Sequence, residues 1–236
     1  MEPMRHRVLA CDYDGTLATE GVVSPAVVES LERISRSGIR LILVTGRTRE
    51  ELYGVFDPGN LFAALIIENG AVVIESSGGE ETLLAPRLPR ALVEELRHVG
   101  VDPLIVGRVL CSTDVSQLPK LLAAITKLGI DRQVVRNRNS TMVLPPGISK
   151  RTGLEVALRA IGELPGATVA VGDGENDVAL FAVAGVSVAV ANAVDLLKAR
   201  ADVVLTRPNG KGVADLADAL VSGNLGALTA LSPLAG

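Results

Sequence analysis

Two hydrophobic patterns alternate along this chain. Short, continuous apolar runs are typical of strands buried inside a sheet, and they occupy residues 7–12, 40–45, 168–171, 187–190 and 202–206. Other segments place apolar residues three or four positions apart, as helices with one buried face do, and they span residues 25–37, 149–161 and 212–221. Strands that alternate with helices in this way predict an α/β fold with a Rossmann-like, mostly parallel sheet.

Residues typical of helix starts and turns mark the borders of several elements. Ser24 and Pro25 suit the N-cap and the first position of a helix. Residues 48–51 (TREE) fit a capping box, in which the first and fourth residues each accept a hydrogen bond from the other's backbone. Residues 68–70 (ENG) predict a tight turn between two apolar runs.

The middle of the chain follows a different order of elements. Residues 81–146 contain helical patterns at 89–99 and 116–128, and strand patterns at 104–112, 133–136 and 141–144. Linker-like residues border this segment at 76–79 (SSGG) and 145–147 (PPG). We therefore expect a small α+β cap domain, residues 81–146, inserted into a core formed by residues 1–80 and 147–221, with residues 222–236 as a tail.

Charge separates the same two parts. The 236 residues carry a net charge of −4, yet residues 82–146 hold nine Lys or Arg against five Asp or Glu, and the remainder holds 14 against 22. A basic module within an acidic chain is either a solvated face or a face for an anionic ligand.

Composition excludes several classes of function. An apolar fraction of 48% argues against intrinsic disorder, and 2% aromatic residues argue against a surface that stacks nucleic-acid bases. Two cysteines cannot form a disulfide framework or a zinc finger. The apolar runs are too short for a signal peptide or a bilayer span. We expect a cytoplasmic protein with a small-molecule partner, without nucleic-acid or membrane binding; the sequence leaves its oligomeric state open.

Four polar clusters lie where predicted strands end or a predicted helix begins. They are residues 12–16 (DYDGT), 44–47 (VTGR), 149–151 (SKR) and 172–177 (GDGEND). In parallel α/β sheets, ligands bind at the edge formed by the carboxyl ends of the strands. None of the four clusters is an EF-hand, a dinucleotide-binding loop or a P-loop.

The acidic clusters favour a divalent cation. Asp12 and Asp14 repel each other unless a cation holds them charged, and Mg²⁺ prefers a few carboxylates together with phosphate and water. Asp173 and Asp177 supply two more carboxylates, and Asn176 adds an amide. Acid-rich turns after strands are also common without a metal, so the first pair alone leaves both interpretations open.

The remaining clusters favour an anion. Thr45 and Gly46 offer a hydroxyl and a backbone N–H that suit a phosphate, although an ordinary strand-to-helix turn has the same residues. Lys150 at a helix N-terminus opposes the helix dipole, at a cost of up to about 1 kcal/mol unless it meets an anion or solvent screens it.

Taken in order, these clusters resemble the haloacid dehalogenase superfamily of Mg²⁺-dependent phosphohydrolases. The matching runs are residues 12–17 (DYDGTL), 45–47 (TGR), Lys150 and 172–177 (GDGEND). Residues 68–71 (ENGA) and the inserted cap are similar to the Cof-type branch, which includes phosphoglycolate and sugar-phosphate phosphatases. The short cap is closest in size to that of the phosphoglycolate-phosphatase-like members.

The resemblance implies roles for individual residues. Asp12 is then the nucleophile that forms an aspartyl phosphate, Asp14 the acid and base, and Lys150 the cation that neutralises the phosphoryl charge. The implied metal positions are Asp12, Asp14 (through its backbone carbonyl), Asp173 and Asp177, with Mg²⁺ as cofactor. The implied phosphate positions are Thr45, Gly46 and Asn176.

Two alternatives remain beside a phosphatase. A phosphomutase of the same superfamily shares the clusters but needs room for two phosphate positions, and a phospho-acceptor signalling domain lacks an acid at the position of Asp14. In the cap, Arg108, Arg136 and Arg138 either bind a second anionic group of the substrate or are solvated or paired with cap acids. The sequence does not choose between phosphoglycolate and a sugar phosphate.

Overall fold

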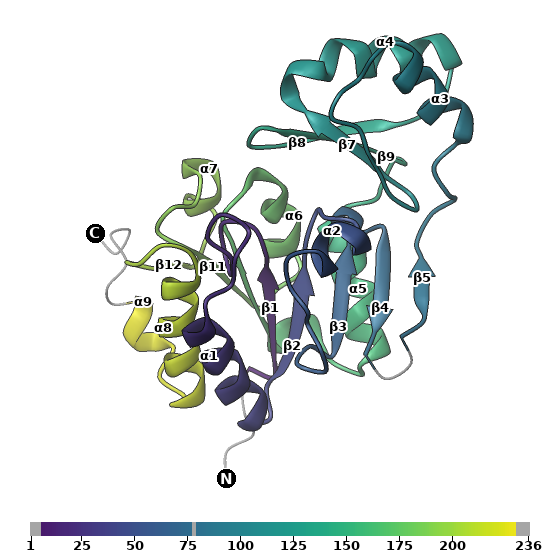
Figure 1. Ribbon diagram of the computed structural model, residues 1–236. Helices are drawn as coiled ribbons and strands as arrows, with labels where there is room; N and C mark the ends of the chain where they lie inside the picture. Colours follow the sequence, from purple (N-terminus) through teal and green to yellow (C-terminus); the bar gives the residue numbers. More distant parts are fainter. Residues whose placement is uncertain (1–5, 77–78, 230–236) are drawn as a thin grey trace.

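A computed structural model describes residues 6–76 and 79–229, and it contains two β-sheets (Figure 1). In spatial order, the larger sheet consists of β12 (Val203–Val204), β11 (Val186–Ala189), β10 (Thr168–Gly172), β1 (Val8–Asp12), β2 (Arg40–Val44), β3 (Ala64–Ile67), β4 (Val72–Glu75) and β5 (Glu81–Leu83). The strands from β12 to β3 are parallel, β4 is antiparallel to β3, and β5 is antiparallel to β4. The predicted mostly parallel α/β sheet is confirmed.

The register of the central strands brings the polar clusters together. All five residues of β1 are buried, as expected for a strand covered on both faces. Asp12 is level with Val44 at the end of β2, and Cys11 is level with Val171, next to the end of β10. The segments that follow these three strands therefore leave the sheet at one edge.

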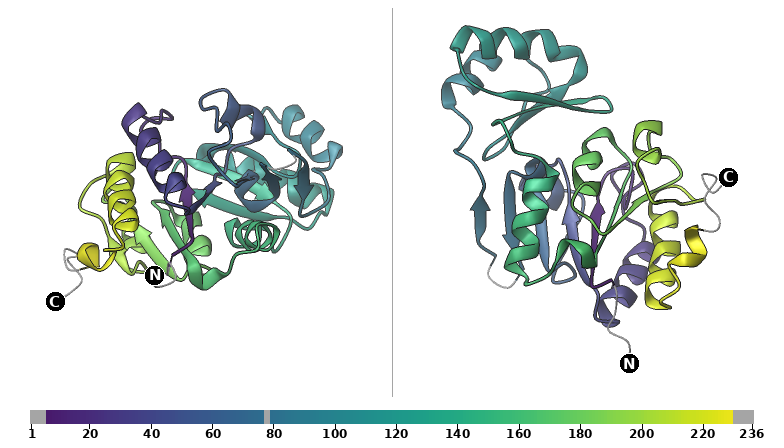
Figure 2. Two further views of the ribbon diagram at one scale, coloured as in Figure 1. Left: turned by 90° about the horizontal axis from the view of Figure 1, so that it is seen from below. Right: turned by 180° about the vertical axis from the view of Figure 1, so that it is seen from behind.

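Helices cover both faces of the large sheet. Helices α1 (Pro25–Arg36) and α8 (Asn209–Val221) pack together on one face, and α5 (Lys150–Ala160) lies on the opposite face (Figure 2). Helix α2 (Arg49–Tyr53) begins with the predicted capping box. Three short helices follow no predicted pattern: α6 (Val178–Phe181), α7 (Asp195–Lys198) and α9 (Gly226–Thr229). Short 3₁₀ turns occupy Glu68–Gly70, Val115–Gln117, Pro165–Ala167 and Glu175–Asp177.

The cap is a separate two-layer unit above the strand ends (Figure 1). Its antiparallel sheet has the order β6 (Ile105–Val106), β7 (Cys111–Asp114), β9 (Ser140–Leu144) and β8 (Gln133–Asn137). Helices α3 (Arg90–His98) and α4 (Leu118–Leu128) cover the face that points away from the large sheet, and Leu92, Leu96 and Leu121 are buried there. The small inserted α+β domain is confirmed.

The structure differs from the predicted boundaries in three places. Strand β5 pairs with β4 in the large sheet, so the chain leaves the core after Leu83 and not at residue 81. The apolar run 104–112 forms two strands, because a turn closed by a hydrogen bond from Gly107 N to Leu110 O interrupts it. Helix α9 lies in the predicted tail, of which residues 230–236 are outside the described part, as are Ser77 and Gly78 of the predicted linker. Within the described residues, no helix combines the length and apolar character of a membrane span.

We expect that Gly70→Ala lowers the free energy of unfolding by about 2–4 kcal/mol. Gly70 has a φ of +98°, and a Cβ there would lie 1.9 Å from the backbone oxygen of Ser149, directly before α5. Urea unfolding followed by circular dichroism measures the loss. The control is Gly59→Ala, because Gly59 also has a positive φ but nothing within 4 Å of a Cβ. Equal losses in both variants would contradict the packing argument.

Candidate active site

A buried lysine joins two carboxylates where the large sheet ends. The Lys150 Nζ lies 2.5 Å from Asp12 Oδ1 and 2.5 Å from Asp177 Oδ1, and the Lys150 side chain is 1% exposed. Helix α5 fixes this position because its first residue is Lys150 and Ser149 N donates a hydrogen bond to Thr152 Oγ1 in the first turn. The lysine at a helix start therefore meets anions, although here they belong to the protein.

The loop after β10 orients the second carboxylate. Asp177 Oδ2 accepts hydrogen bonds from the backbone N–H of Asp173 and of Gly174, both at 2.9 Å. A Cβ at Gly172 would lie 2.6 Å from Asp177 Cγ, so only glycine leaves room for this side chain. Asp173 Oδ1 in turn accepts a hydrogen bond of 3.2 Å from Thr16 Oγ1. Both acids of the loop are therefore held in fixed positions.

These acids carry more negative charge than the lysine compensates. Burial, and then the negative charge of Asp177, raise the pKa of Asp12 well above its usual range, although Lys150 acts in the opposite direction. Burial and Asp177 also raise the pKa of Asp173. Burial alone would lower the pKa of Lys150, yet the two carboxylates raise it above its ordinary value. A further positive charge would stabilise the ionised acids.

The donor set fits a hard divalent cation. Asp12, Asp173 and Asp177 are buried, and each offers a carboxylate oxygen within 4.8 Å of the oxygens of the other two. Oxygen ligands of this kind suit Mg²⁺. Among the described residues, the Asp14 carboxylate is not part of this group.

Asp14 is held by an arginine from the neighbouring strand end. Arg47 Nε and Nη2 donate to the two carboxylate oxygens of Asp14, both at 2.8 Å. The guanidinium carbon lies 5.4 Å from the centre of the Tyr13 ring, and the Tyr13 hydroxyl donates to Gly21 O. Such a bidentate pair holds the Asp14 carboxylate facing Arg47.

The predicted phosphate positions lie around the same edge. Thr45 is buried, and its hydroxyl oxygen accepts a hydrogen bond of 3.1 Å from Arg47 N. The next residue, Gly46, lines the cavity. Asn176 is buried beside the loop acids and donates to Asn69 Oδ1 at 2.9 Å. Asn176 therefore ties the acidic loop to the 68–70 turn.

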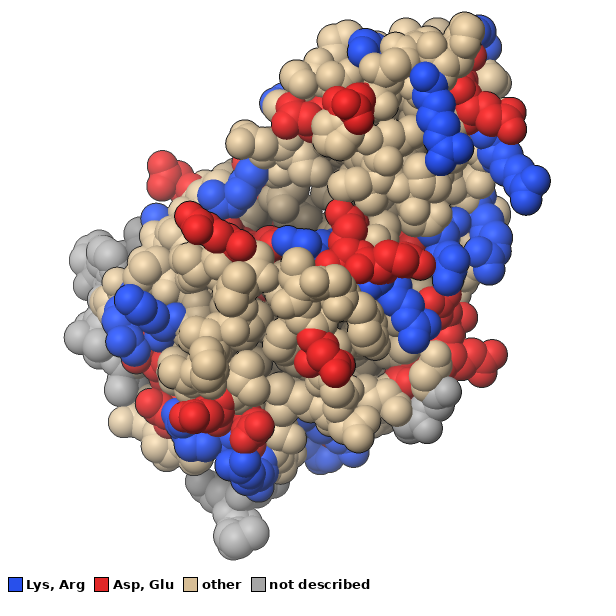
Figure 3. Space-filling model, viewed as in Figure 1, with Lys and Arg blue, Asp and Glu red and all other residues tan. Residues whose placement is uncertain are grey.

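A cavity of about 800 Å³ separates these groups from the cap. Figure 3 shows the hollow between the two domains, with charged side chains of both signs around it. The core contributes Asp12, Asp14, Gly46 and Arg47 to its wall, and the cap contributes residues that include Thr113, Arg138, Ser140 and Met142. A Cβ at Gly46 would lie 3.3 Å from the Met142 sulfur, so cap and core approach closely beside the cavity.

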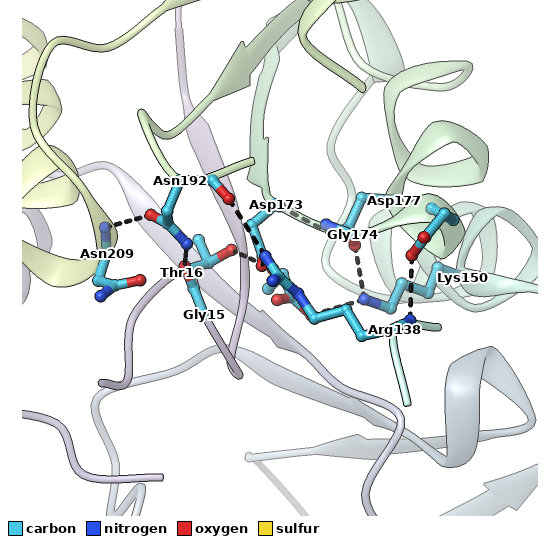
Figure 4. Close-up of polar contacts among 11 residues, drawn as sticks. Gly15, Thr16, Arg138, Lys150, Asp173, Gly174, Asp177, Asn192 and Asn209 are labelled. Atoms are coloured by element: carbon cyan, nitrogen blue, oxygen red, sulfur yellow. Dashed lines mark hydrogen bonds and ion pairs between the residues drawn. The ribbon is translucent and has the colours of Figure 1, made fainter. Parts of the chain in front are cut away.

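The cap cations occupy different places. Arg138 reaches from the β8–β9 hairpin to Asp173 Oδ2 and to Asn192 O, as Figure 4 shows. The Arg108 side chain pairs with Glu81 at 3.2 Å, outside the cavity wall. Arg136 is exposed on β8 and does not line the cavity either. Of the three cap arginines considered for an anionic group of the substrate, the structure therefore brings Arg138 to the acidic group, and neither Arg108 nor Arg136.

Sequence reasoning missed two residues that shape this site. Asn192 lines the cavity, donates to Gly15 O at 2.8 Å and accepts from Asn209 N at 2.8 Å. It follows β11, so the rule that ligands gather at the carboxyl ends of strands indicates this position. Glu68 is buried and accepts hydrogen bonds from three consecutive backbone N–H groups of the cap, at residues 108–110. No sequence signal pairs these distant segments.

Comparisons with known proteins point to one family. The model of the haloacid dehalogenase-like hydrolases matches residues 9–100 and 104–216. The chain is 34% identical to phosphoglycolate phosphatase 2 of Saccharolobus solfataricus, over 93% of this chain and 94% of that protein. It is 36% identical to phosphoglycolate phosphatase of Halorubrum lacusprofundi, over 87% and 93%. A crystal structure of a haloacid dehalogenase-like hydrolase from Bacteroides thetaiotaomicron has a TM-score of 0.72 and 25% identity, covering 90% of this chain and 98% of that one.

We expect that Lys150→Met lowers the free energy of unfolding by about 3–5 kcal/mol, because the change leaves two buried carboxylates without their cation. Burial and Asp177 raise the pKa of Asp12 and Lys150 lowers it, so without Lys150 the folded state holds the Asp12 proton still more firmly, and the variant loses more stability than the unaltered protein as the pH rises above about 4. The deficit of the variant should therefore be larger at pH 8 than at pH 5 in urea unfolding.

The matched control for this variant is Lys127→Met. Lys127 pairs with Glu95 at 2.7 Å, but its side chain is 62% exposed, so its loss should cost about 1 kcal/mol or less. A Lys150→Met variant that is no less stable than this control would contradict the central role of the buried lysine.

Proposed function

Since the chain belongs to the haloacid dehalogenase-like hydrolases and is a phosphatase of that family, we propose that it hydrolyses a small phosphomonoester such as phosphoglycolate through an aspartyl phosphate on Asp12. The observation that carries this proposal is the buried Asp12–Lys150–Asp177 arrangement, of which Asp12 lines the cavity. It places an anchored carboxylate next to a fixed positive charge, where a phosphoryl group can enter from the cavity.

Asp12 is the nucleophile in this proposal. Lys150 engages Asp12 Oδ1, which leaves the second oxygen for attack on phosphorus. The new bond joins this oxygen to phosphorus as the bond between phosphorus and the leaving oxygen breaks. Because a carboxylate is a weak nucleophile, the reaction depends on neutralisation of the phosphoryl oxygens. In this proposal, Lys150, the Gly46 backbone N–H and the Thr45 hydroxyl interact with the phosphoryl oxygens.

Asp14 is the acid and base. In the first step it gives its proton to the leaving oxygen, and in the second it takes a proton from the water that attacks the phosphoenzyme and releases inorganic phosphate. The Asp14 carboxylate faces Arg47, so the acid role requires the side chain to turn from Arg47 toward the substrate.

Asp12, Asp173 and Asp177, with the backbone carbonyl of Asp14, are the groups that would hold Mg²⁺. The ion, when bound, supplies positive charge to the phosphoryl oxygens. Asp177 is fixed by two backbone N–H groups and Asp173 by Thr16, so both carboxylates are already positioned by the protein.

The substrate class follows from the cavity and the relatives. Two of the most similar relatives are phosphoglycolate phosphatases that align over nearly their whole length. Cap residues line the same cavity as Asp12, and its wall carries polar groups such as Thr113 and Ser140 with few large apolar side chains. A small, doubly anionic phosphate suits such a space better than a large apolar ester.

We expect phosphate release from phosphoglycolate in the presence of Mg²⁺, loss of that activity with EDTA, and a decrease in kcat of about 10³-fold or more in Asp12→Asn. The amide keeps the shape of the side chain but removes the attacking charge. The control is Asp57→Asn, since Asp57 is exposed and its Oδ1 accepts from Gly59 N, which an amide oxygen can also do. Turnover by Asp12→Asn at a rate near that of the control would remove Asp12 as nucleophile.

We also expect Mg²⁺ at about 100 times its dissociation constant to stabilise the protein by about 2.7 kcal/mol, which raises the Tm by about 5–10 °C. Asp173→Asn should abolish most of this shift, because Asp173 offers one of the clustered oxygens. Glu29→Gln on the exposed face of α1 removes the same charge and should keep the shift. Differential scanning calorimetry measures the Tm in EDTA and in Mg²⁺. Equal rises in Tm for the unaltered protein, Asp173→Asn and Glu29→Gln would contradict the assigned site.

A further inference from the structure

The tip of the β8–β9 hairpin inserts a cation from the cap into the acidic group of the core. The guanidinium of Arg138 donates to Asp173 Oδ2 and, at 3.2 Å, to Asn192 O (Figure 4). The backbone N–H of the same residue donates to Glu175 Oε2 at 3.1 Å. A Cβ at Gly174 would lie 2.3 Å from Asn137 Oδ1, so the hairpin rests directly on the loop that holds the acids.

The backbone of Arg138 is unusual for an arginine. Its φ is +51°, in the left-handed region that glycine and asparagine adopt far more readily than residues with long side chains. Asn139 is the other residue of this two-residue loop, since Asn137 and Ser140 still pair across the strands. An arginine at the strained position gives the turn no conformational advantage, which indicates that its side chain is what the site uses.

Arg138 is also the cavity arginine whose carboxylate partner would be shared with a bound cation. Among the described residues of the cavity wall, Arg47 and Arg138 are the two that carry positive charge. Arg47 donates to both oxygens of Asp14, whereas Arg138 pairs with Asp173, one of the three acids whose oxygens would hold a divalent cation. A cation bound there compensates the charge of Asp173 and leaves the guanidinium without its carboxylate partner.

We propose that Arg138 is the specificity-determining residue of the cap, which exchanges Asp173 for the carboxylate of the substrate when the cation binds. This inference rests on the proposed function, and it identifies the substrate carboxylate as the group that the cap binds. A guanidinium binds a carboxylate through two parallel hydrogen bonds, so the exchange replaces one carboxylate partner by another. Because Arg138 lies in the same cavity wall as Asp12, it can meet the distal end of a substrate that is only a few atoms long.

The test compares Arg138→Gln with Arg136→Gln on two substrates of similar size. Phosphoglycolate carries the carboxylate, and 2-hydroxyethyl phosphate carries a hydroxymethyl group in its place. Arg138→Gln should raise KM for phosphoglycolate about 10- to 100-fold, leave kcat within about threefold, and change KM for 2-hydroxyethyl phosphate by less than about threefold. Arg136→Gln, an exposed position two residues away and outside the cavity wall, should match the unaltered protein on both.

Two outcomes on this substrate pair overturn the proposal. Equal increases in KM for both substrates would mean that Arg138 binds the phosphate or only positions the cap. An unchanged KM for phosphoglycolate would mean that Arg138 does not touch the substrate. Urea unfolding of both variants shows whether a loss comes from folding, and Arg138→Lys, which keeps the charge but not the paired hydrogen bonds, should lie between the unaltered protein and Arg138→Gln.

A second measurement needs no turnover. Because Arg138 competes with the cation for Asp173, Arg138→Gln should bind Mg²⁺ about tenfold more tightly in isothermal titration calorimetry without substrate, and Arg136→Gln should not. Unchanged or weaker Mg²⁺ binding by Arg138→Gln overturns the exchange. If the unaltered protein hydrolyses no phosphoester, the proposed function fails, and calorimetric binding of phosphoglycolate with Mg²⁺ then decides the role of Arg138: equal affinity in the unaltered protein and in Arg138→Gln overturns it.

Discussion

The hydrogen bonds of one buried lysine to two carboxylates set the position of almost everything else in the site. Lys150 can be charged inside the protein only because Asp12 and Asp177 lie 2.5 Å from its Nζ. These three side chains come from the end of β1, the start of α5 and the turn after β10, so their contacts fix three elements that are distant in sequence. Gly70 extends the same constraint to the β3–β4 turn, because the start of α5 fits only against a residue without a Cβ.

The cap is bound to this core by charge as much as by apolar contact. Glu68 receives three backbone N–H groups of the cap, and Arg138 extends in the opposite direction, from the cap to Asp173. A buried carboxylate with several backbone donors is well compensated. The Glu68 contacts therefore hold the cap on the core, whereas the Arg138 side chain, 46% exposed, is the contact that we propose a ligand replaces.

The sequence indicated the core and its site better than the cap contacts. Buried strands with continuous apolar runs have a strong local signal, and parallel strands bring their carboxyl ends to one edge, so Asp12, Lys150 and Asp177 could be expected together. The contacts of Arg108, Arg136 and Arg138 depend on how the cap sits on the core, which no local pattern encodes. The three cap arginines therefore lie in three different environments. Arg108 forms a surface ion pair with Glu81, Arg136 is exposed on a strand, and Arg138 lies in the cavity wall. The same limitation explains β5, whose three residues join the core sheet only through pairing with β4.

Charge balance explains why a divalent cation and a phosphate suit this cavity together. Apart from Glu20, Glu51 and Asp114, which also line the cavity, the acids Asp12, Asp14, Asp173 and Asp177 pair with Lys150, Arg47 and Arg138, and this paired set has a net charge of −1. A phosphate monoester that arrives as a dianion would make this −3 in a partly buried space, where uncompensated charge is costly. A divalent cation that enters with it would restore the original balance, and in the proposed exchange the Arg138 guanidinium would leave Asp173 and become available to a second anionic group. The proposed arrangement would therefore favour a substrate with two anionic ends, because the cation would compensate the phosphoryl end and Arg138 the other end.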